Sequence, residues 1–450
     1  SEQTAEKIID SYLSILQSNP HLHDKLEFDV AFTVWTPTFK AEAVKRLTPH
    51  GISIEQIDEM EHELKGITQG AILRLDDDIK SIHVLIERRA LLENSDLLPI
   101  DKAMMVLEDC KRFGSLAFAH AARAGFVAMS FLKSFVSLGI LTEKDKNAFL
   151  KTIKTVAGEF EKDGRAILNK DLSKETYLKR YGHLRPGTYD VTIEAYWEAP
   201  QRYLSPSGLF CGEKGDGSQF QFSGETRDAI VSEFKKIDTE FTFDQIINYI
   251  KKAIQAREYI KFEFTSNLSR ALDMFVECGL DLEFTRESIS YLNVNDFEQL
   301  KVGSLVKEDL PALVKQRMQN ILITQMVELP QVLFQESDFY CFERYASQPN
   351  FVTGKRVEAE VLAWEGKEVS ELDGKIILIS QADPGYDWLF NHNITGLITK
   401  YGGANSHMAI RAAEMGLPAA IGIGDKLYEK FSNTQRILLD CANQLIRTIR

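Results

Sequence analysis

Apolar residues recur at steps of three and four through most of the first 340 residues, which predicts a mainly helical fold there. One run covers residues 101–139, where Gly139 is placed to end the helix. Another covers residues 243–279 without an internal proline, behind Thr242 and Gln245, which fit a capping box. We therefore expect one or two long core helices over residues 243–279.

Shorter signals surround these runs. Thr142 with Asp145, and Asn295 with Glu298, predict two further helix starts. Residues 25–35 (KLEFDVAFTVW) are the exception, because their roughly alternating, β-rich pattern predicts a strand. Residues 181–225 have no helical period and are rich in glycine, proline and aromatic residues; loops of this length are usually functional or disordered.

The pattern changes after residue 353, where short β-rich runs alternate with helical segments, as in a compact α/β domain. The predicted organisation is a mainly helical region over residues 1–345, a hinge over 346–353 and a small α/β domain over 354–450. Five β-rich runs in the small domain predict strands: residues 355–364, 375–380, 394–400, 418–423 and 436–441.

Composition narrows the function classes. The formal net charge of −13 argues against nucleic acid or an anionic membrane as a partner. The longest apolar stretch, residues 125–141, is interrupted by Lys133 and serines and predicts a buried helix. The five cysteines lack C-x-x-C spacing and the nine histidines lack metal-site grouping, so we expect no disulfide framework, no metal site and a cytoplasmic location.

The most informative chemistry lies at a histidine after the third of these strands. Gly402 and Gly403 permit a tight turn, Asn405 or Ser406 can cap a helix, and His407 then falls in its first turn. Unpaired amides and the helix dipole at that position favour an attached phosphoryl group and disfavour the imidazolium ion. The pattern predicts a neutral, nucleophilic His407 suited to carrying phosphate, with the two glycines, Asn405 and Ser406 supporting it.

The segment GGANSHMAIRAAEMGLPAAIGIGD, residues 402–425, resembles the phosphohistidine signature of the phosphoenolpyruvate-utilising enzymes. That family includes phosphoenolpyruvate synthase, pyruvate phosphate dikinase and rifampicin phosphotransferase. The preceding Asp-Pro segment is also similar, so the resemblance covers the whole small domain. The chain departs from it at Asn405, where many members have threonine, and at Ala412–Ala413, where they have Ala-Arg.

The resemblance implies a swivelling phosphohistidine domain that takes phosphate from ATP at His407, at Nε2 by analogy with the family, and delivers it to an acceptor such as pyruvate. ATP and Mg²⁺ are expected on an ATP-grasp-type domain upstream or in trans, because no phosphate-binding glycine loop occurs in the first 340 residues. Ser1 as the first residue also suggests that such a domain has been removed. The long apolar helices would suit a homodimer.

Candidate acceptor-binding residues lie in the aromatic-rich loop: His183, Arg185, Tyr189 and Arg202. Arg185 could pair with a phosphate or carboxylate, and His183 could accept a hydroxyl proton. The alternative is a structural loop in which Arg185 pairs with a core carboxylate. For the whole chain, the alternative is a non-catalytic regulatory or scaffold module that retains the phosphohistidine fold.

Overall fold

The computed structural model describes residues 2–187, 189–203, 220–237, 241–327, 329–330, 332–342, 349–364, 372–404 and 406–449. The described residues before 343 are mainly helical and are called the helical domain. Its α-helices are α1 (Glu2–Ser18), α2 (Phe39–Leu47), α3 (Ile54–Glu93), α4 (Pro99–Asp109), α5 (Ser115–Ser137), α6 (Glu143–Lys151), α7 (Val156–Leu168), α8 (Lys174–Tyr181), α9 (Pro200–Tyr203), α10 (Gly224–Phe234), α11 (Phe243–Asp281), α12 (Arg286–Ser290), α13 (Val294–Val302) and α14 (Leu310–Gln325).

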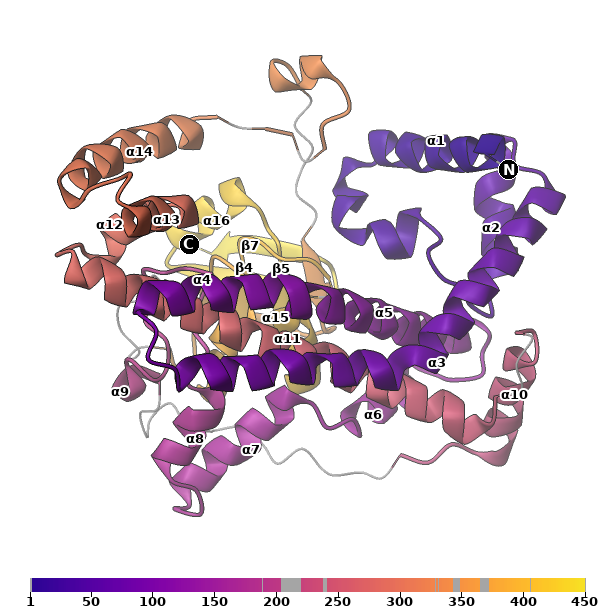
Figure 1. Cartoon of the computed structure of the whole chain (residues 1–450). Helices are drawn as coiled ribbons and strands as arrows, with labels where there is room; N and C mark the ends of the chain where they lie inside the picture. The colour runs from indigo at the N-terminus through magenta and orange to yellow at the C-terminus, as the bar shows by residue number, and fades with distance from the viewer. Residues whose placement is uncertain are drawn as a thin grey trace.

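The predicted long helices are confirmed. The capping box forms, since Thr242 N donates to Gln245 Oε1 at 2.8 Å and Gln245 N to Thr242 Oγ1 at 3.3 Å. From there α11 runs 39 residues and packs against α3, α4 and α5 (Figure 1). Apolar residues on successive turns of α11 are buried, which gives the helical domain a continuous axis.

The run at residues 101–139 forms α4, one π-helical segment (η4, Cys110–Gly114) and α5, and Gly139 adopts the left-handed φ of 71° after the helix. Among the described residues, the stretch Pro99–Ser137 is long and apolar enough to cross a membrane by length and composition alone, although core helices pass the same test. Here α5 packs against α3 and α11.

Two local predictions are wrong. The expected strand at residues 25–35 is instead the end of a 3₁₀ segment (η1, Pro20–Lys25), a π-helical segment (η2, Leu26–Val30) and a loop. Trp35 N donates to Thr68 Oγ1 of α3 at 2.8 Å, so helices, not a sheet, surround the segment. The helix expected at Asn295 begins two residues earlier, where Asn293 and Asp296 form the capping box.

The C-terminal domain is a seven-stranded sheet in the order β1-β5-β4-β3-β2-β6-β7. Strands β2 to β5 are parallel, and β1, β6 and β7 pair antiparallel at the edges. Its elements are β1 (Asn350–Val352), β2 (Arg356–Ala363), β3 (Ile376–Ile379), η7 (Pro384–Asn391), β4 (Gly396–Thr399), α15 (His407–Met415), β5 (Ala419–Ile421), α16 (Asp425–Ser432), β6 (Arg436–Asp440) and β7 (Leu445–Ile449). All five predicted strands are present.

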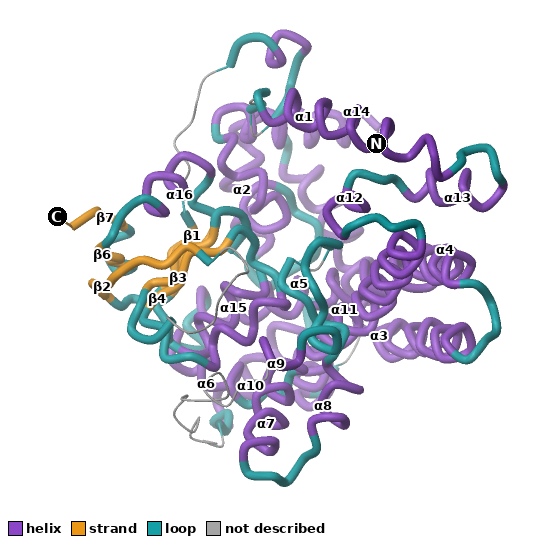
Figure 2. The backbone as a smooth tube through the Cα atoms, turned by 90° about the vertical axis from the view of Figure 1, so that its left-hand side faces the viewer, coloured by secondary structure: helices purple, strands orange, loops and turns teal. Residues whose placement is uncertain are grey.

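The structure moves the start of this domain. Residues 350–352, assigned to the hinge from sequence, form β1 and pair with β5, so the domain begins near residue 350. Residues 346–348 of the predicted hinge lie outside the described part of the chain. Figure 2 shows the sheet at the edge of the molecule, with α15 on its helical-domain side.

The two domains share one hydrophobic cluster. Phe160, Tyr177 and Tyr196 of the helical domain join Trp388 and Met408 of the C-terminal domain in it. Tyr196 also donates its hydroxyl hydrogen to the carbonyl of Gly385 at 3.1 Å. The C-terminal domain is therefore docked on the helical domain, with η7 and α15 at the interface.

Candidate phosphohistidine site

His407 is the first residue of α15, as predicted. Ser406 is the N-cap, and its hydroxyl accepts a hydrogen bond from Ala409 N at 3.4 Å. Gly416 ends the helix with a left-handed φ of 61°. Asn405 lies outside the described residues.

The glycine pair makes the turn before α15 possible. Gly402 has φ 131°, and a Cβ at this position would lie 2.5 Å from the Cβ of Ala382. Gly403 accepts a hydrogen bond from Ser406 N at 3.0 Å. Only glycine fits position 402, and the turn sets the direction in which α15 begins.

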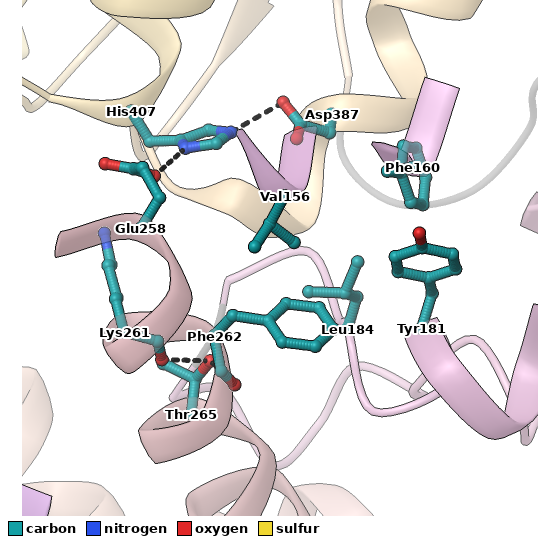
Figure 3. A pocket seen from close by; sticks show the side chains of 10 residues that line it. All are labelled: Val156, Phe160, Tyr181, Leu184, Glu258, Lys261, Phe262, Thr265, Asp387 and His407. Carbon is teal, nitrogen blue, oxygen red and sulfur yellow. Dashed lines mark hydrogen bonds and ion pairs between the residues drawn. The ribbon is translucent and has the colours of Figure 1, made fainter. Parts of the chain in front are cut away.

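Two carboxylates from different domains hold the imidazole of His407 (Figure 3). Nε2 lies 2.7 Å from Asp387 Oδ1, on η7 of the same domain. Nδ1 lies 3.3 Å from Glu258 Oε2, on α11 of the helical domain. The histidine is only 8% exposed, so water screens these contacts weakly.

The carboxylates decide the charge of the ring. Burial is the largest effect and lowers the pKa of His407, but Asp387 and Glu258 together raise it from 6.5 to about 9. Burial likewise raises the pKa of Glu258, yet its bond to His407 and the ring's charge bring it down to about 2. The neutral ring predicted from the helix terminus is therefore wrong for this conformation, because two full charges outweigh the partial charge of a helix end.

A cavity of about 30 Å³ opens beside the ring, room for about two water molecules. Its lining divides into an apolar wall and a polar end. The wall consists of Val156, Phe160, Tyr181, Leu184 and Phe262, and the polar end of Glu258, Lys261, Thr265, Asp387 and His407. Lys261 extends along α11 toward Glu258 (Figure 3), and its burial lowers its pKa although Glu258 opposes the change.

Arg411 adds positive charge one helical turn after His407. Its Nε lies 3.6 Å from Asp387 Oδ1, and the side chain is 5% exposed. Residues four apart on a helix share a face, so Arg411 and His407 contact the same carboxylate. Asp387 is thus held between the imidazole and a guanidinium of its own domain.

The predicted acceptor residues do not gather at this cavity. Arg185 is 1% exposed and ion-pairs with Asp273, while its other nitrogens donate to Ser269 Oγ and the carbonyls of Asp190 and Ile193. These contacts match the alternative of a structural loop, in which Arg185 pairs with a buried carboxylate and stabilises the loop conformation.

The other three residues of that set are dispersed. His183 is buried against Phe262, and burial lowers its pKa to about 3, so it stays neutral. Tyr189 is 65% exposed. Arg202 lies in α9, and its side chain is outside the described part. His183, Arg185 and Tyr189 are absent from the cavity lining in the described structure.

Asp387, Glu258 and Lys261 were not predicted from the sequence. Asp387 belongs to the Asp-Pro segment that resembles the family pattern, which was the one available signal for it. Glu258 and Lys261 lie three residues apart on a core helix, where charged side chains on a half-buried face need partners. No sequence pattern indicates that Glu258 contacts His407, which lies 149 residues further along the chain.

Comparison with known proteins agrees with this geometry. Residues 371–444 match the mobile domain of PEP-utilising enzymes. Over these residues the chain is similar to the PEP-utilising enzymes. The C-terminal domain is accordingly called the mobile domain below, and the resemblance noted in the sequence is confirmed.

Curated relatives extend the similarity into the helical domain. A rifampicin phosphotransferase from a Streptomyces species is 26% identical over 275 residues, which is 55% of this chain and 31% of the relative. The rifampicin phosphotransferase of Bacillus subtilis is 25% identical over 275 residues, with the same coverage. The match thus spans about a third of the length of these relatives, and the relatives are phosphotransferases.

Proposed function

We propose that this chain is the C-terminal part of a phosphotransferase similar to phosphoenolpyruvate synthase, with His407 as its phosphoryl carrier. The supporting observation is the position of His407: it is the first residue of a helix of the mobile domain and lines a cavity between the two domains, together with Lys261 of the helical domain. ATP and Mg²⁺ would be held by an ATP-grasp-type domain outside the sequence given. The acceptor is a small molecule bound at the helical domain, and the reaction belongs in the cytoplasm.

Charging requires a neutral ring nitrogen, which attacks a phosphorus atom of ATP while the P–O bond of the nucleotide breaks. In the docked conformation both carboxylates favour the imidazolium, which has no free electron pair. Charging therefore takes place after the mobile domain has moved away from the helical domain, so that His407 no longer contacts Glu258. Asp387 travels with His407 and keeps the ring oriented.

Delivery takes place when the mobile domain returns to the cavity with its phosphate, before the contact between His407 and Glu258 forms again. An acceptor oxygen attacks phosphorus, the N–P bond breaks, and a proton from an acceptor hydroxyl passes to a carboxylate at the polar end of the cavity. Lys261 supplies positive charge for the phosphoryl oxygens. The apolar wall suits an acceptor with an apolar body; pyruvate and rifampicin, the latter taken from the names of the relatives, represent the small and large extremes.

The test uses the full-length gene product with β- and γ-labelled ATP. Phosphohistidine is acid-labile and base-stable, so label with these properties is expected in the wild type and absent from His407→Ala. His392→Ala is a matched control, because His392 follows η7 in the same domain without contacting His407. Wild-type protein without label, or equal label on His407→Ala, would contradict the carrier role.

The scaffold alternative makes a different prediction from the same sample. A module that only signals its phosphorylation state keeps its label when pyruvate, rifampicin or other acceptors are added. A transferase loses the label to an acceptor at a rate that depends on acceptor concentration. The alanines at 412 and 413, where many relatives carry Ala-Arg, make this comparison necessary.

A further inference from the structure

His407 is contacted by one carboxylate of its own domain and by one carboxylate of the other domain. Asp387 belongs to the mobile domain, whereas Glu258 belongs to α11 of the helical domain. The Glu258 contact is thus an ion pair across the domain interface. Both side chains are largely buried, at 7% and 16% exposure, so the pair is more strongly coupled than a surface salt bridge.

The docked geometry is specific for an unphosphorylated ring. Each ring nitrogen already faces a carboxylate oxygen, at 2.7 Å and 3.3 Å. A phosphoryl group on either nitrogen would take the place of one of these oxygens. The adjoining cavity, with room for about two waters, cannot receive a displaced carboxylate without the domains moving.

Phosphorylation also reverses the charge at this point. The ring nitrogen loses its proton to water and forms an N–P bond as the P–O bond of the donor breaks. The imidazolium, with charge +1, is thereby replaced by a group with a charge of about −2. That group would face Glu258 and Asp387, with Lys261 and Arg411 as the cations nearby.

The rest of the interface is incompletely paired. In the described structure three buried polar groups of the shared cluster have no hydrogen-bond partner: the Tyr177 hydroxyl and the indole nitrogens of Trp364 and Trp388. Any of these donors that docking buries opposes docking, because it regains water when the domains separate. The apolar contacts favour docking, so a change of charge at His407 can shift the balance.

We propose that the Glu258–His407 ion pair is a latch that keeps the mobile domain docked on the helical domain while His407 is unphosphorylated, and that phosphorylation of His407, once the domain has undocked, keeps the latch released. The latch itself is independent of catalysis; its release rests on the carrier role proposed above. The mobile domain would then separate from Glu258 to be charged, and the ion pair would form again only after the phosphate has been delivered.

Hydrogen–deuterium exchange of the full-length protein tests the latch without any phosphoryl donor. The probe is the peptide spanning η7, which docking covers through Tyr196 and the backbone of Arg185. Glu258→Gln and His407→Gln should raise its exchange rate about tenfold, and His407→Asp, which places a third carboxylate in the cluster, should raise it further. Peptides of α5 and β6 report whether each variant is still folded.

Glu263→Gln is the matched control. Glu263 lies on the same helix, is similarly buried and forms an ion pair, but its partner is Arg89 within the helical domain. It should leave the exchange of η7 unchanged. Treating the wild type with phosphoramidate, which phosphorylates histidine without ATP, should then open the domain as His407→Asp does.

The outcomes separate the two proposals. Equal exchange in wild type and Glu258→Gln overturns the latch, whether or not His407 carries phosphate. A phosphorylated wild type that stays docked overturns the release. If η7 exchanges faster in Glu258→Gln but ATP does not label the wild type, the latch is supported and the carrier function is ruled out.

Discussion

The raised pKa of His407 gives the sharpest test of the site, because it can be measured on the protein alone. A pKa of about 9 in place of 6.5 corresponds to roughly 3 kcal/mol of preference for the protonated ring. Glu258→Gln removes one of the two charges responsible, so the pKa should fall by at least one unit, worth about 1.4 kcal/mol. Asp387→Asn should lower it further, since Asp387 is the closer carboxylate.

The sign of the pH dependence follows from this direction. The folded-state pKa of His407 lies above its unfolded value, so the stabilisation is fully present below about pH 6.5 and is lost as the pH rises through about 9. The pKa of Glu258 is lowered to about 2, so its contribution is present above about pH 4.5 and is lost only in strong acid. Docking should therefore be strongest from about pH 5 to 7 and weaken in alkaline solution.

Histidine-selective NMR can follow this titration, with His407→Gln identifying the resonance. Glu263→Gln should leave the pKa of His407 unchanged, which separates the local carboxylate from a general loss of negative charge. A wild-type His407 that titrates at or below 6.5 would refute the reasoning, because it would mean that burial, and not the two carboxylates, controls the ring.

Three further substitutions test other parts of the structure. Gly385→Ala should weaken docking while leaving charging by ATP intact, because a Cβ there would overlap the carbonyl of Arg185; exchange of η7 and phosphate labelling measure the two effects, and wild-type docking would contradict this packing. Lys261→Met should slow discharge of phosphohistidine to an acceptor by about a hundredfold in single-turnover assays; an equal loss in charging would mean that Lys261 has another role. Arg185→Met should lower the free energy of unfolding by about 3 kcal/mol in urea titrations, since it leaves Asp273 buried without its partner. Unchanged stability with slower discharge would instead restore Arg185 as an acceptor ligand.

Local signals in the sequence predicted most of the fold. Capping boxes at Thr142 and Thr242 specify helix starts through contacts only three residues apart, and both form. Strands β3, β4 and β5 were predicted from short, mostly apolar runs, and all three are fully buried, as is typical of parallel strands covered on both faces. The prediction for residues 25–35 was wrong because the apolar residues of an alternating pattern can be buried against helices as well as in a sheet. Helices are what surround this segment.

Only the local part of the site, the turn before α15 and the first residue of that helix, could be predicted from the sequence. Gly402, Ser406 and His407 act through backbone geometry within five residues, and the structure places them as expected. The charge of the ring depends on Glu258, whose position relative to His407 is set by the docking of two domains. No periodicity or spacing encodes that distance, so a correct helix terminus led to an incorrect protonation state.

The two carboxylates also resolve a difficulty in the proposed reaction. A carrier histidine must be a good leaving group when it delivers phosphate and a good nucleophile when it is charged, and a single pKa cannot favour both. Docking provides two values: beside Glu258 the ring takes up a proton easily, which assists cleavage of the N–P bond, and away from Glu258 it gives that proton up more readily. In this proposal the domain movement changes the chemistry of His407 as well as its position, because one of the two carboxylates that favour protonation belongs to the helical domain that receives the phosphate.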